Sequence, residues 1–322
     1  MKLLVIGGAG YIGAHVVKAL LDEGHDVTVF DNLSSGRRRN LFANARFVQG
    51  DILDSPMIVE TLRAGFDAVF HFAAFKAAGE SMIEPEKYAL NNISGTINIL
   101  NAMSRAEVKN IVFSSSAAVY GSPKYLPIDE DHNLNPDNFY GFTKLDIERL
   151  LAWYNRLKGL RYVALRYFNA AGYDMEGVVR GLEKNPANLL PVIMETACGM
   201  RNEFVIFGND YPTPDGTGIR DYIHVSDLAT AHCFALQYIV KHGQCITLNL
   251  GSGQGLSVME VYRKAQEITG VEIPMKIGPR RAGDPAQLFA SGERARKTLG
   301  FSPRFSDAET LIKSTWQMYR GA

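Results

Sequence analysis

The stretch 2-KLLVIGGAGYIG-13 decides the fold expected for this chain. It begins with a short apolar run, Lys2–Ile6, and continues into residues 11–23, whose apolar side chains have helical spacing. Gly7, Gly10 and Gly13 therefore lie where a strand turns sharply into a helix. Glycine suits this turn because the backbone must approach a pyrophosphate and the helix must pack closely on the strand. The context predicts a dinucleotide site rather than a tight turn without a ligand.

The alternation of strand and helix continues through the first half of the chain. Apolar runs of strand length, separated by helical segments, occur at residues 26–30, 46–50, 67–73, 110–116 and 160–168. Strands this apolar are buried on both faces, because helices cover each side of a parallel sheet. The fold class expected is α/β, with a Rossmann-type doubly wound parallel sheet.

The alternation ends beyond Asn169, where glycine and proline become frequent. A length of 322 residues also suggests two domains, at about 100–200 residues each. We expect an NAD-binding Rossmann domain at residues 1–168 and a smaller C-terminal α/β substrate domain at residues 169–322. Part of residues 220–250 is expected to pack back on the Rossmann sheet.

Composition excludes several classes of partner. Lys+Arg and Asp+Glu both number 34, so no general electrostatic field favours nucleic acid or an anionic membrane. The cysteines Cys198, Cys233 and Cys245 lack metal-ligand spacing, so we expect no metal site and a reducing compartment. The first apolar run is too short for a signal core, and no run approaches 18 apolar residues. A cytoplasmic protein is expected.

Asp31 bears on the choice of cofactor, since it ends the second apolar run 18 residues after Gly13. A carboxylate there accepts hydrogen bonds from the adenosine ribose and repels a 2′-phosphate, which favours NAD over NADP. Arg37, Arg38 and Arg39 favour the opposite choice, because arginines after the second strand could hold that phosphate. A solvated basic loop is the interpretation we prefer, and NADP stays open.

The pattern Tyr-x-x-x-Lys occurs three times, at Tyr120/Lys124, Tyr140/Lys144 and Tyr154/Lys158. The first pair contains a proline and cannot share a helical face. The other two pairs lie about 21 Å apart if they share one helix. Ligands of an open parallel sheet bind at the carboxyl ends of the strands, where the following helices begin, and only Tyr140 lies at that end.

The same reasoning selects Ser116, at the carboxyl end of the run 110–116. Ser116, Tyr140 and Lys144 are therefore candidate catalytic residues beside a nicotinamide. The tyrosine pKa of about 10 must fall if the side chain is to act as a base near neutrality. A cation at about 6 Å contributes roughly 2.8 kcal/mol, or about two pKa units, at an effective dielectric near 20. We expect Lys144 and the positive nicotinamide ring together to lower the tyrosine pKa enough.

These motifs resemble those of the extended short-chain dehydrogenase/reductase superfamily. The resemblance rests on 7-GGAGYIG-13, 113-FSSSAAVYG-121, the Tyr140/Lys144 pair and 166-RYFNAAG-172. Further stretches are similar to those of the UDP-glucose 4-epimerase family: 74-AFKAAGES-81, 206-IFGNDYPTPDGTGIRDYIHV-225, 249-NLGSGQG-255 and 279-PRRAGD-284. The similarity runs from Met1 nearly to the C-terminus.

The resemblance implies site residues by position. Those matching NAD contacts are Gly7, Gly10, Tyr11, Ile12, Gly13, Asp31, Asn32, Asp51, Ile52, Phe72, Ala73, Lys76, Asn91, Ser116, Tyr140, Lys144 and Phe168. Those matching the UDP-sugar pocket are Ser116, Tyr140, Asn169, Asn188, Leu189, Val205, Phe207, Arg220, Arg281, Asp284 and Leu288, with the two arginines on the diphosphate. Guanidinium groups suit that role because they bind phosphate oxygens in a fixed fork.

Several positions depart from the family pattern. Asn138 and Phe139 replace a common Ser-Pro before the tyrosine, and we expect local repacking without loss of the catalytic trio. The segment 173–191 matches poorly before Asn188. Leu288 stands where the family carries a large aromatic or a small residue that limits the substituent at C2 of the sugar.

The resemblance implies an NAD-dependent epimerase that interconverts UDP-galactose and UDP-glucose by oxidation at C4, rotation of a 4-keto sugar and reduction of its other face. A UDP-N-acetylhexosamine 4-epimerase is an alternative, since leucine at position 288 is intermediate in size. A nucleotide-sugar 4,6-dehydratase would need an acid pair where Ala117 and Ala118 stand. A non-catalytic NAD-binding sensor commonly lacks the tyrosine. A homodimer is the family expectation.

Overall fold

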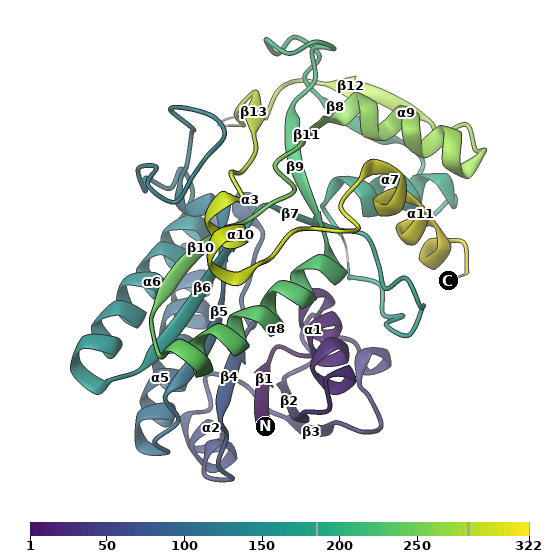
Figure 1. The fold of residues 1–322 in the computed structure, drawn as a ribbon. Helices are drawn as coiled ribbons and strands as arrows, with labels where there is room; N and C mark the ends of the chain where they lie inside the picture. The colour runs from purple at the N-terminus through teal and green to yellow at the C-terminus, as the bar shows by residue number, and fades with distance from the viewer. Residues whose placement is uncertain (185, 282–283, 322) are drawn as a thin grey trace.

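The computed structural model describes residues 1–184, 186–281 and 284–321. Its centre is a seven-stranded sheet of order β10-β6-β5-β4-β1-β2-β3, in which every neighbouring pair is parallel (Figure 1). The strands are β1 (Lys2–Ile6), β2 (Asp26–Asp31), β3 (Arg46–Gln49), β4 (Ala68–His71), β5 (Asn110–Ser116), β6 (Arg161–Tyr167) and β10 (Ile246–Leu250). The predicted Rossmann-type α/β fold is confirmed.

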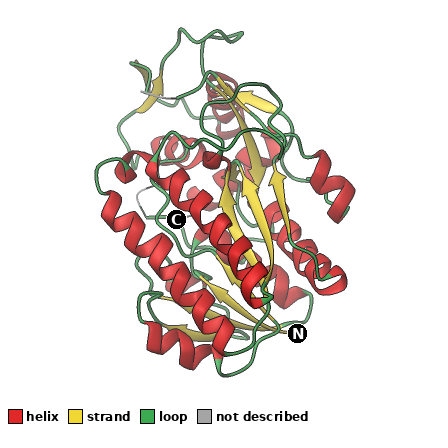
Figure 2. Cartoon of the chain, turned by 90° about the vertical axis from the view of Figure 1, so that its left-hand side faces the viewer, coloured by secondary structure: helices red, strands yellow, loops and turns green. Residues whose placement is uncertain are grey.

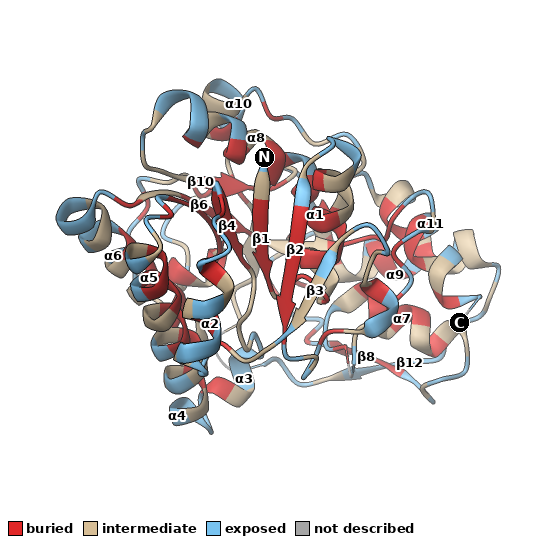
Figure 3. Cartoon of the chain, turned by 90° about the horizontal axis from the view of Figure 1, so that it is seen from below, coloured by how far each residue is buried: buried red, intermediate tan, exposed pale blue. Residues whose placement is uncertain are grey.

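Strand β1 explains why the apolar runs show no polar alternation. Leu3 and Val5 lie in a core on one face of the sheet, whereas Leu4 and Ile6 lie in a second core on the other face. The buried strands β1 and β2 stand out between the helices in Figure 3. Both faces of the strand are therefore removed from water, which favours residues that are apolar at every position.

Helices cover both faces of this sheet (Figure 2). The core that contains Leu3 is closed by α1 (Tyr11–Asp22) and α8 (Val225–His242). The opposite core is closed by α2 (Ser55–Leu62), α5 (Gly95–Arg105) and α6 (Phe139–Lys158). Three short helical segments precede α5: α3 (Ala78–Ser81), α4 (Pro85–Tyr88) and a π-helical stretch, Ala89–Ser94. Within the described ranges, no helix combines the length and low polarity needed to cross a membrane.

The seventh strand of the sheet comes from the second half of the chain. Strand β10 pairs with β6 from Ile246 opposite Val163 to Leu250 opposite Tyr167. Helix α8, which precedes β10, packs beside α1. A division of the chain at residue 168 stays a prediction, and the sheet takes one edge strand from beyond that point.

The remaining elements form a smaller α/β unit at the carboxyl end of the sheet. Its strands are β7 (Asn169–Ala171), β8 (Phe204–Phe207), β9 (Ile219–His224), β11 (Gly255–Ser257), β12 (Met275–Gly278) and β13 (Gln287–Leu288). Its helices are α7 (Leu189–Ala197), α9 (Val258–Thr269) and α11 (Ala308–Tyr319), and α10 (Glu293–Leu299) packs near β10. A separate core that includes Tyr173, Ile193 and Ile312 joins the three helices. The carboxyl end of the Rossmann sheet therefore faces a second folded unit (Figure 1).

Candidate active site

The turn after β1 leaves backbone bare at the edge of the sheet. Gly7 has a φ of +82°, and a Cβ atom there would lie 2.6 Å from the Ala73 nitrogen. A Cβ atom at Gly13 would lie 2.2 Å from the Gly7 carbonyl oxygen. Side chains are therefore excluded where α1 begins, and the exposed backbone fits a pyrophosphate at a helix N-terminus.

A cavity of about 600 Å³ opens beside this turn. It is lined by fourteen of the residues predicted to bind NAD: Gly7, Gly10, Tyr11, Ile12, Gly13, Asp31, Asn32, Ile52, Phe72, Ala73, Lys76, Asn91, Tyr140 and Lys144. Asp51 lies outside the lining, where its carboxylate accepts a hydrogen bond of 2.8 Å from the Asn32 amide. Ser116 and Phe168 are also outside this lining, and Phe168 packs against the apolar cluster that contains Tyr120.

Asp31 is held at the wall of this cavity in a fixed orientation. Its carboxylate accepts hydrogen bonds from the backbone of Ala9, at 3.0 Å, and of Leu33, at 2.8 Å. Burial raises the pKa of Asp31, while these two hydrogen bonds and the charge of Lys184 oppose the rise. Such a carboxylate fits the hydroxyls of a ribose, and it would repel a phosphate in the same place. The cavity is therefore suited to NAD.

Tyr140 and Lys144 lie one turn apart at the start of α6. The Asn138 side chain caps this helix by accepting a 2.8 Å hydrogen bond from the Gly141 nitrogen. Ser81 accepts a 3.0 Å hydrogen bond from the Tyr140 nitrogen. Asparagine is a good capping residue, so the departure from the family's Ser-Pro keeps the helix start in place. Ser81, which fixes the backbone of Tyr140, ends the stretch 74-AFKAAGES-81 that resembles the family, but it was not predicted to be a site residue.

The Lys144 ammonium lies between the sheet and the tyrosine. Its nitrogen donates a 2.7 Å hydrogen bond to the Ser114 carbonyl and lies 5.9 Å from the centre of the Tyr140 ring. Burial lowers the pKa of Lys144 to about 7, although the charge of Glu148 opposes that change. Near neutral pH the lysine is therefore only partly charged.

The surroundings of Tyr140 in the protein alone do not lower its pKa. Burial raises this pKa, and interaction with the Ser116 hydroxyl opposes the rise. The Lys144 nitrogen lies near the Tyr140 ring, but a partly protonated lysine attracts a phenolate less than a full charge does. The protein's side chains alone therefore do not produce a phenolate at neutral pH.

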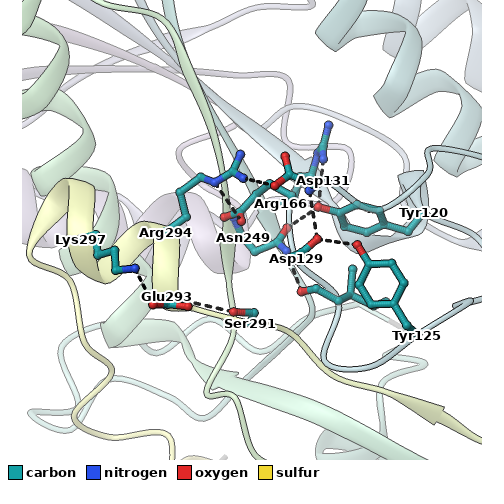
Figure 4. Close-up of polar contacts among 12 residues, drawn as sticks. Tyr120, Tyr125, Asp129, Asp131, Arg166, Asn249, Ser291, Glu293, Arg294 and Lys297 are labelled. Atoms are coloured by element: carbon teal, nitrogen blue, oxygen red, sulfur yellow. Dashed lines mark hydrogen bonds and ion pairs between the residues drawn. The ribbon is translucent and has the colours of Figure 1, made fainter.

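A buried ionic network lies behind the catalytic strand. Arg166 on β6 donates two hydrogen bonds to the Glu148 carboxylate, at 2.6 and 2.9 Å, and a third to the Tyr120 hydroxyl at 2.9 Å. Tyr120 in turn donates to the Asn249 side chain on β10 at 2.6 Å (Figure 4). Ser115 on β5 donates a 2.5 Å hydrogen bond to Glu148. The network therefore joins β5, β6, β10 and α6 next to Lys144.

A second cavity, of about 640 Å³, lies in the smaller unit. Eight residues predicted to bind the UDP-sugar line it: Asn169, Asn188, Leu189, Val205, Phe207, Arg220, Arg281 and Asp284. Arg220 forms a 2.5 Å ion pair with Asp284, and the Arg281 guanidinium lies 4.1 Å from the centre of the Phe207 ring. Two arginines in one cavity suit a diphosphate. Pro186, Ala187 and Asn188 line both cavities, so the two spaces adjoin.

Leu288 lies outside the linings of both cavities. It is paired with Arg220 across β13 and β9, and it packs against the cluster formed by Ala117, Val119, Tyr120, Ile128 and Leu145. That cluster includes the turn directly after Ser116. Leu288 is therefore near the catalytic strand, and its contact with a sugar stays a prediction.

Residues 181–184, 186 and 187 were not predicted to take part in either site. Gly181, Leu182, Glu183, Lys184, Pro186 and Ala187 all line the first cavity. The segment carries no periodicity or motif that marks a ligand contact, so only the folded chain reveals its position.

Comparisons with known proteins agree with this geometry. The model of the NAD dependent epimerase/dehydratase family matches residues 3–251. A UDP-glucose 4-epimerase of Lactobacillus helveticus is 45% identical over 321 residues, which cover 99% of this chain and 97% of that protein.

Two solved structures are also closely similar. The UDP-glucose 4-epimerase from Brucella ovis in complex with NAD is 44% identical with a TM-score of 0.96, covering 99% of this chain and 98% of that one. The UDP-glucose-4-epimerase from Stenotrophomonas maltophila, with bound NAD and formylated UDP-arabinopyranose, is 42% identical with a TM-score of 0.96, covering 100% and 98%. A glycine turn that leaves bare backbone, an oriented Asp31 and a family match across most of the sequence together show that the chain belongs to the NAD dependent epimerase/dehydratase family.

Proposed function

We propose that this protein is an NAD-dependent epimerase that interconverts UDP-galactose and UDP-glucose. The observation that carries the proposal is the junction of the two cavities at residues 186–188. One cavity holds Tyr140 and Lys144, and the other holds Arg220 and Arg281. A UDP-sugar bound by its diphosphate in the second cavity can extend its hexose toward Tyr140. The similarity to UDP-glucose 4-epimerases over nearly the whole chain supports this assignment.

Side chains of the protein accept and return the proton of the sugar 4-hydroxyl. NAD bound in the first cavity supplies the hydride acceptor and donor for C4. Tyr140 as a phenolate accepts the hydroxyl proton, either directly or through Ser116, and later returns it. Lys144 orients the nicotinamide ribose and adds positive charge next to the phenolate. Burial alone raises the pKa of Tyr140 and so disfavours the phenolate. A positive charge on the nicotinamide would oppose this effect and favour the phenolate.

Rotation of the 4-keto sugar requires that the nucleotide stay bound while the hexose is released. Arg220 and Arg281 are the residues we assign to the diphosphate during this step. The ion pair between Arg220 and Asp284 keeps the guanidinium in place at the cavity wall. The two arginines therefore act as the tether about which the sugar turns.

The alternative reactions are less well supported by the side chains present. A 4,6-dehydratase needs an acid pair beside the catalytic serine, and Ala117 and Ala118 occupy those positions. A UDP-N-acetylhexosamine 4-epimerase needs room for an acetamido group at C2 of the sugar. Leu288 is our candidate for the residue that limits this room. A sensor without catalysis would have no use for Ser116, Tyr140 and Lys144 together.

We also propose a homodimer located in the cytoplasm. Phe142, Trp153 and Leu157 are exposed on α6. At 100° per residue, spacings of 11 and 4 place them within about 60° of one another on the helix. An exposed apolar stripe of this kind supports association through α6, and sedimentation equilibrium of the wild-type protein would test it.

A location in a reducing compartment is supported by the free thiols Cys198, Cys233 and Cys245.

The experiment is to incubate the purified protein with UDP-galactose and follow the sugar by proton NMR. Formation of UDP-glucose supports the epimerase, a dehydrated sugar supports the dehydratase, and no change supports the sensor. Tyr140→Phe should reduce turnover by at least the roughly 10²–10⁴-fold typical of a lost acid–base group. Tyr154→Phe is the matched control, since the Tyr154 hydroxyl donates to Asn101 at an exposed position. Equal losses in both variants would contradict the assignment of Tyr140.

A further inference from the structure

Residues 181–184 of the smaller unit lie against two loops of the Rossmann sheet. The Gly181 nitrogen donates a 2.7 Å hydrogen bond to the Asn40 side chain. The Arg37 guanidinium donates a 2.9 Å hydrogen bond to the Leu182 carbonyl. Both partners belong to the loop after β2. These contacts join chain segments that are more than 140 residues apart in sequence.

Two lysines complete the attachment. Lys184 donates to the carbonyls of Leu33, at 3.3 Å, and Ser34, at 3.1 Å, in the same loop. Glu183 forms an ion pair with Lys76, which follows β4. Residues 181–184 are therefore fixed to the loop after β2 and to the loop after β4, on the two sides of the glycine turn.

Asn40 makes the attachment a closely packed one. It is buried, and its amide donates a 3.0 Å hydrogen bond to the Ala9 carbonyl inside the glycine-rich turn. A Cβ atom at Gly181 would lie 2.4 Å from the Asn40 side-chain oxygen. The Arg37 nitrogen also donates to the Ala9 carbonyl, at 3.0 Å. The segment is thus tied to the same backbone that we assign to the pyrophosphate.

All four residues of the segment line the 600 Å³ cavity together with Asp31, Tyr140 and Lys144. We propose that residues 181–184 are a strap that holds NAD in this cavity and slows its dissociation, with Arg37 and Glu183 as the positioning residues that keep the strap closed. The proposal rests on the proposed function in one respect: an epimerase returns each hydride to the same sugar, so retention of the cofactor favours turnover.

In the strap, Arg37 holds a backbone carbonyl, a role that differs from both the solvated loop and the 2′-phosphate site considered from the sequence. Its guanidinium is directed at the Leu182 carbonyl, whereas the neighbouring Arg38 donates to the Gln49 side chain at 2.8 Å. Arg37 is therefore bonded to the strap, and Arg38 is bonded within the Rossmann unit. This difference supplies a matched pair of variants with the same change in charge.

The test measures the rate at which bound NAD is lost. Protein loaded with radiolabelled NAD is diluted into excess unlabelled NAD, and the label that stays with the protein is followed by rapid filtration. Arg37→Met keeps the aliphatic stem and removes the hydrogen bond to Leu182, so the loss of label should accelerate about tenfold, as expected for one bond made by a charged group. Arg38→Met should release label at the wild-type rate.

Glu183→Gln provides an independent variant, because it breaks the ion pair with Lys76 and leaves the Arg37 contact intact. Faster loss of label in both Arg37→Met and Glu183→Gln supports the strap. Wild-type rates in both variants, or equal acceleration in Arg37→Met and Arg38→Met, would overturn it. Because label retention is measured without any sugar, the result is independent of the proposed epimerase reaction, which is scored separately by conversion of UDP-galactose.

Discussion

Mild acid should destabilise this protein through four buried histidines. His15, His71, His224 and His232 are each at most 3% exposed. Burial lowers the pKa of His15 and His232 to about 4 and that of His71 and His224 to about 3. Within the described residues, one ring nitrogen of His15, His71 and His232 has no hydrogen-bond partner, so a proton added there would be a buried, unpaired charge.

The sign of the effect follows from these pKa values. A histidine in the unfolded chain titrates near about 6.5, so below that pH the unfolded state binds more protons than the folded state and stability falls. Between pH 7.5 and 5.5 each buried histidine should cost about 1.3 kcal/mol, and four should cost about 5 kcal/mol. Asp31, Glu130 and Asp221 act in the opposite direction, because burial raises their pKa values. Lys144 acts in the same direction as the histidines, because burial lowers its pKa to about 7. The value of about 5 kcal/mol is therefore the contribution of the four histidines.

Urea unfolding followed by circular dichroism at pH 7.5 and 5.5 measures the net loss. His232→Gln removes one titrating ring, so it should reduce the pH-dependent loss by about 1.3 kcal/mol whatever its constant cost to stability. His242→Gln is the control, since His242 is exposed at the end of α8. A total loss below about 1 kcal/mol, or an unchanged pH dependence in His232→Gln, would refute the reasoning.

Three further predictions concern the site. Asp31→Ala should weaken NAD retention, because it removes the acceptor for the adenosine ribose, and chromatography of the denatured protein should then recover less NAD; recovery of NADP from the wild type would count against this role. Glu148→Gln should lower the free energy of unfolding by about 3–5 kcal/mol, since it leaves the Arg166 charge buried and unpaired. Urea titration measures this change, and a value under about 1 kcal/mol would mean that the ion pair contributes little to stability. Leu288→Ser should raise kcat/KM for UDP-N-acetylglucosamine while UDP-glucose loses at most about 1–3 kcal/mol of packing; an unchanged ratio of the two substrates would place the limit on the C2 substituent elsewhere.

Local sequence was enough to predict the Rossmann unit and the residues at the centre of the first cavity, whereas other predicted residues of its wall, such as Asn32 and Asn91, came only from the family resemblance. Gly7, Gly13, Asp31 and Tyr140 each lie at an end of a strand or at the start of a helix, where residue type and position follow from the connection itself. Such positions are determined by the few residues on either side. This is why reasoning from the sequence could place them.

The strap could not be predicted in the same way. Gly181 contacts Asn40 and Leu182 contacts Arg37 across more than 140 residues, and neither contact is encoded by a nearby pattern. For the same reason, Arg37 was predicted to lie in a solvated loop or at a phosphate site, and its hydrogen bond to the Leu182 carbonyl was not considered. The effect of burial on Tyr140 and Lys144 could not be predicted from the sequence, because it raises the pKa of the tyrosine and lowers that of the lysine through side chains that are distant in the chain. The lower tyrosine pKa expected with NAD bound stays a prediction.

The position of β10 at the edge of the sheet has a consequence for synthesis of the chain. Strand β6 ends at Tyr167 and its outer neighbour begins at Ile246, so nearly 80 residues must be translated between the two. At about 5–20 residues per second, the ribosome takes about 4–16 s to deliver them. During that interval the outer edge of β6 and the face of the sheet that α8 will cover are exposed on the nascent chain. Unpaired strand edges and exposed apolar faces are prone to aggregation, so this interval is one in which the nascent chain would benefit from a chaperone.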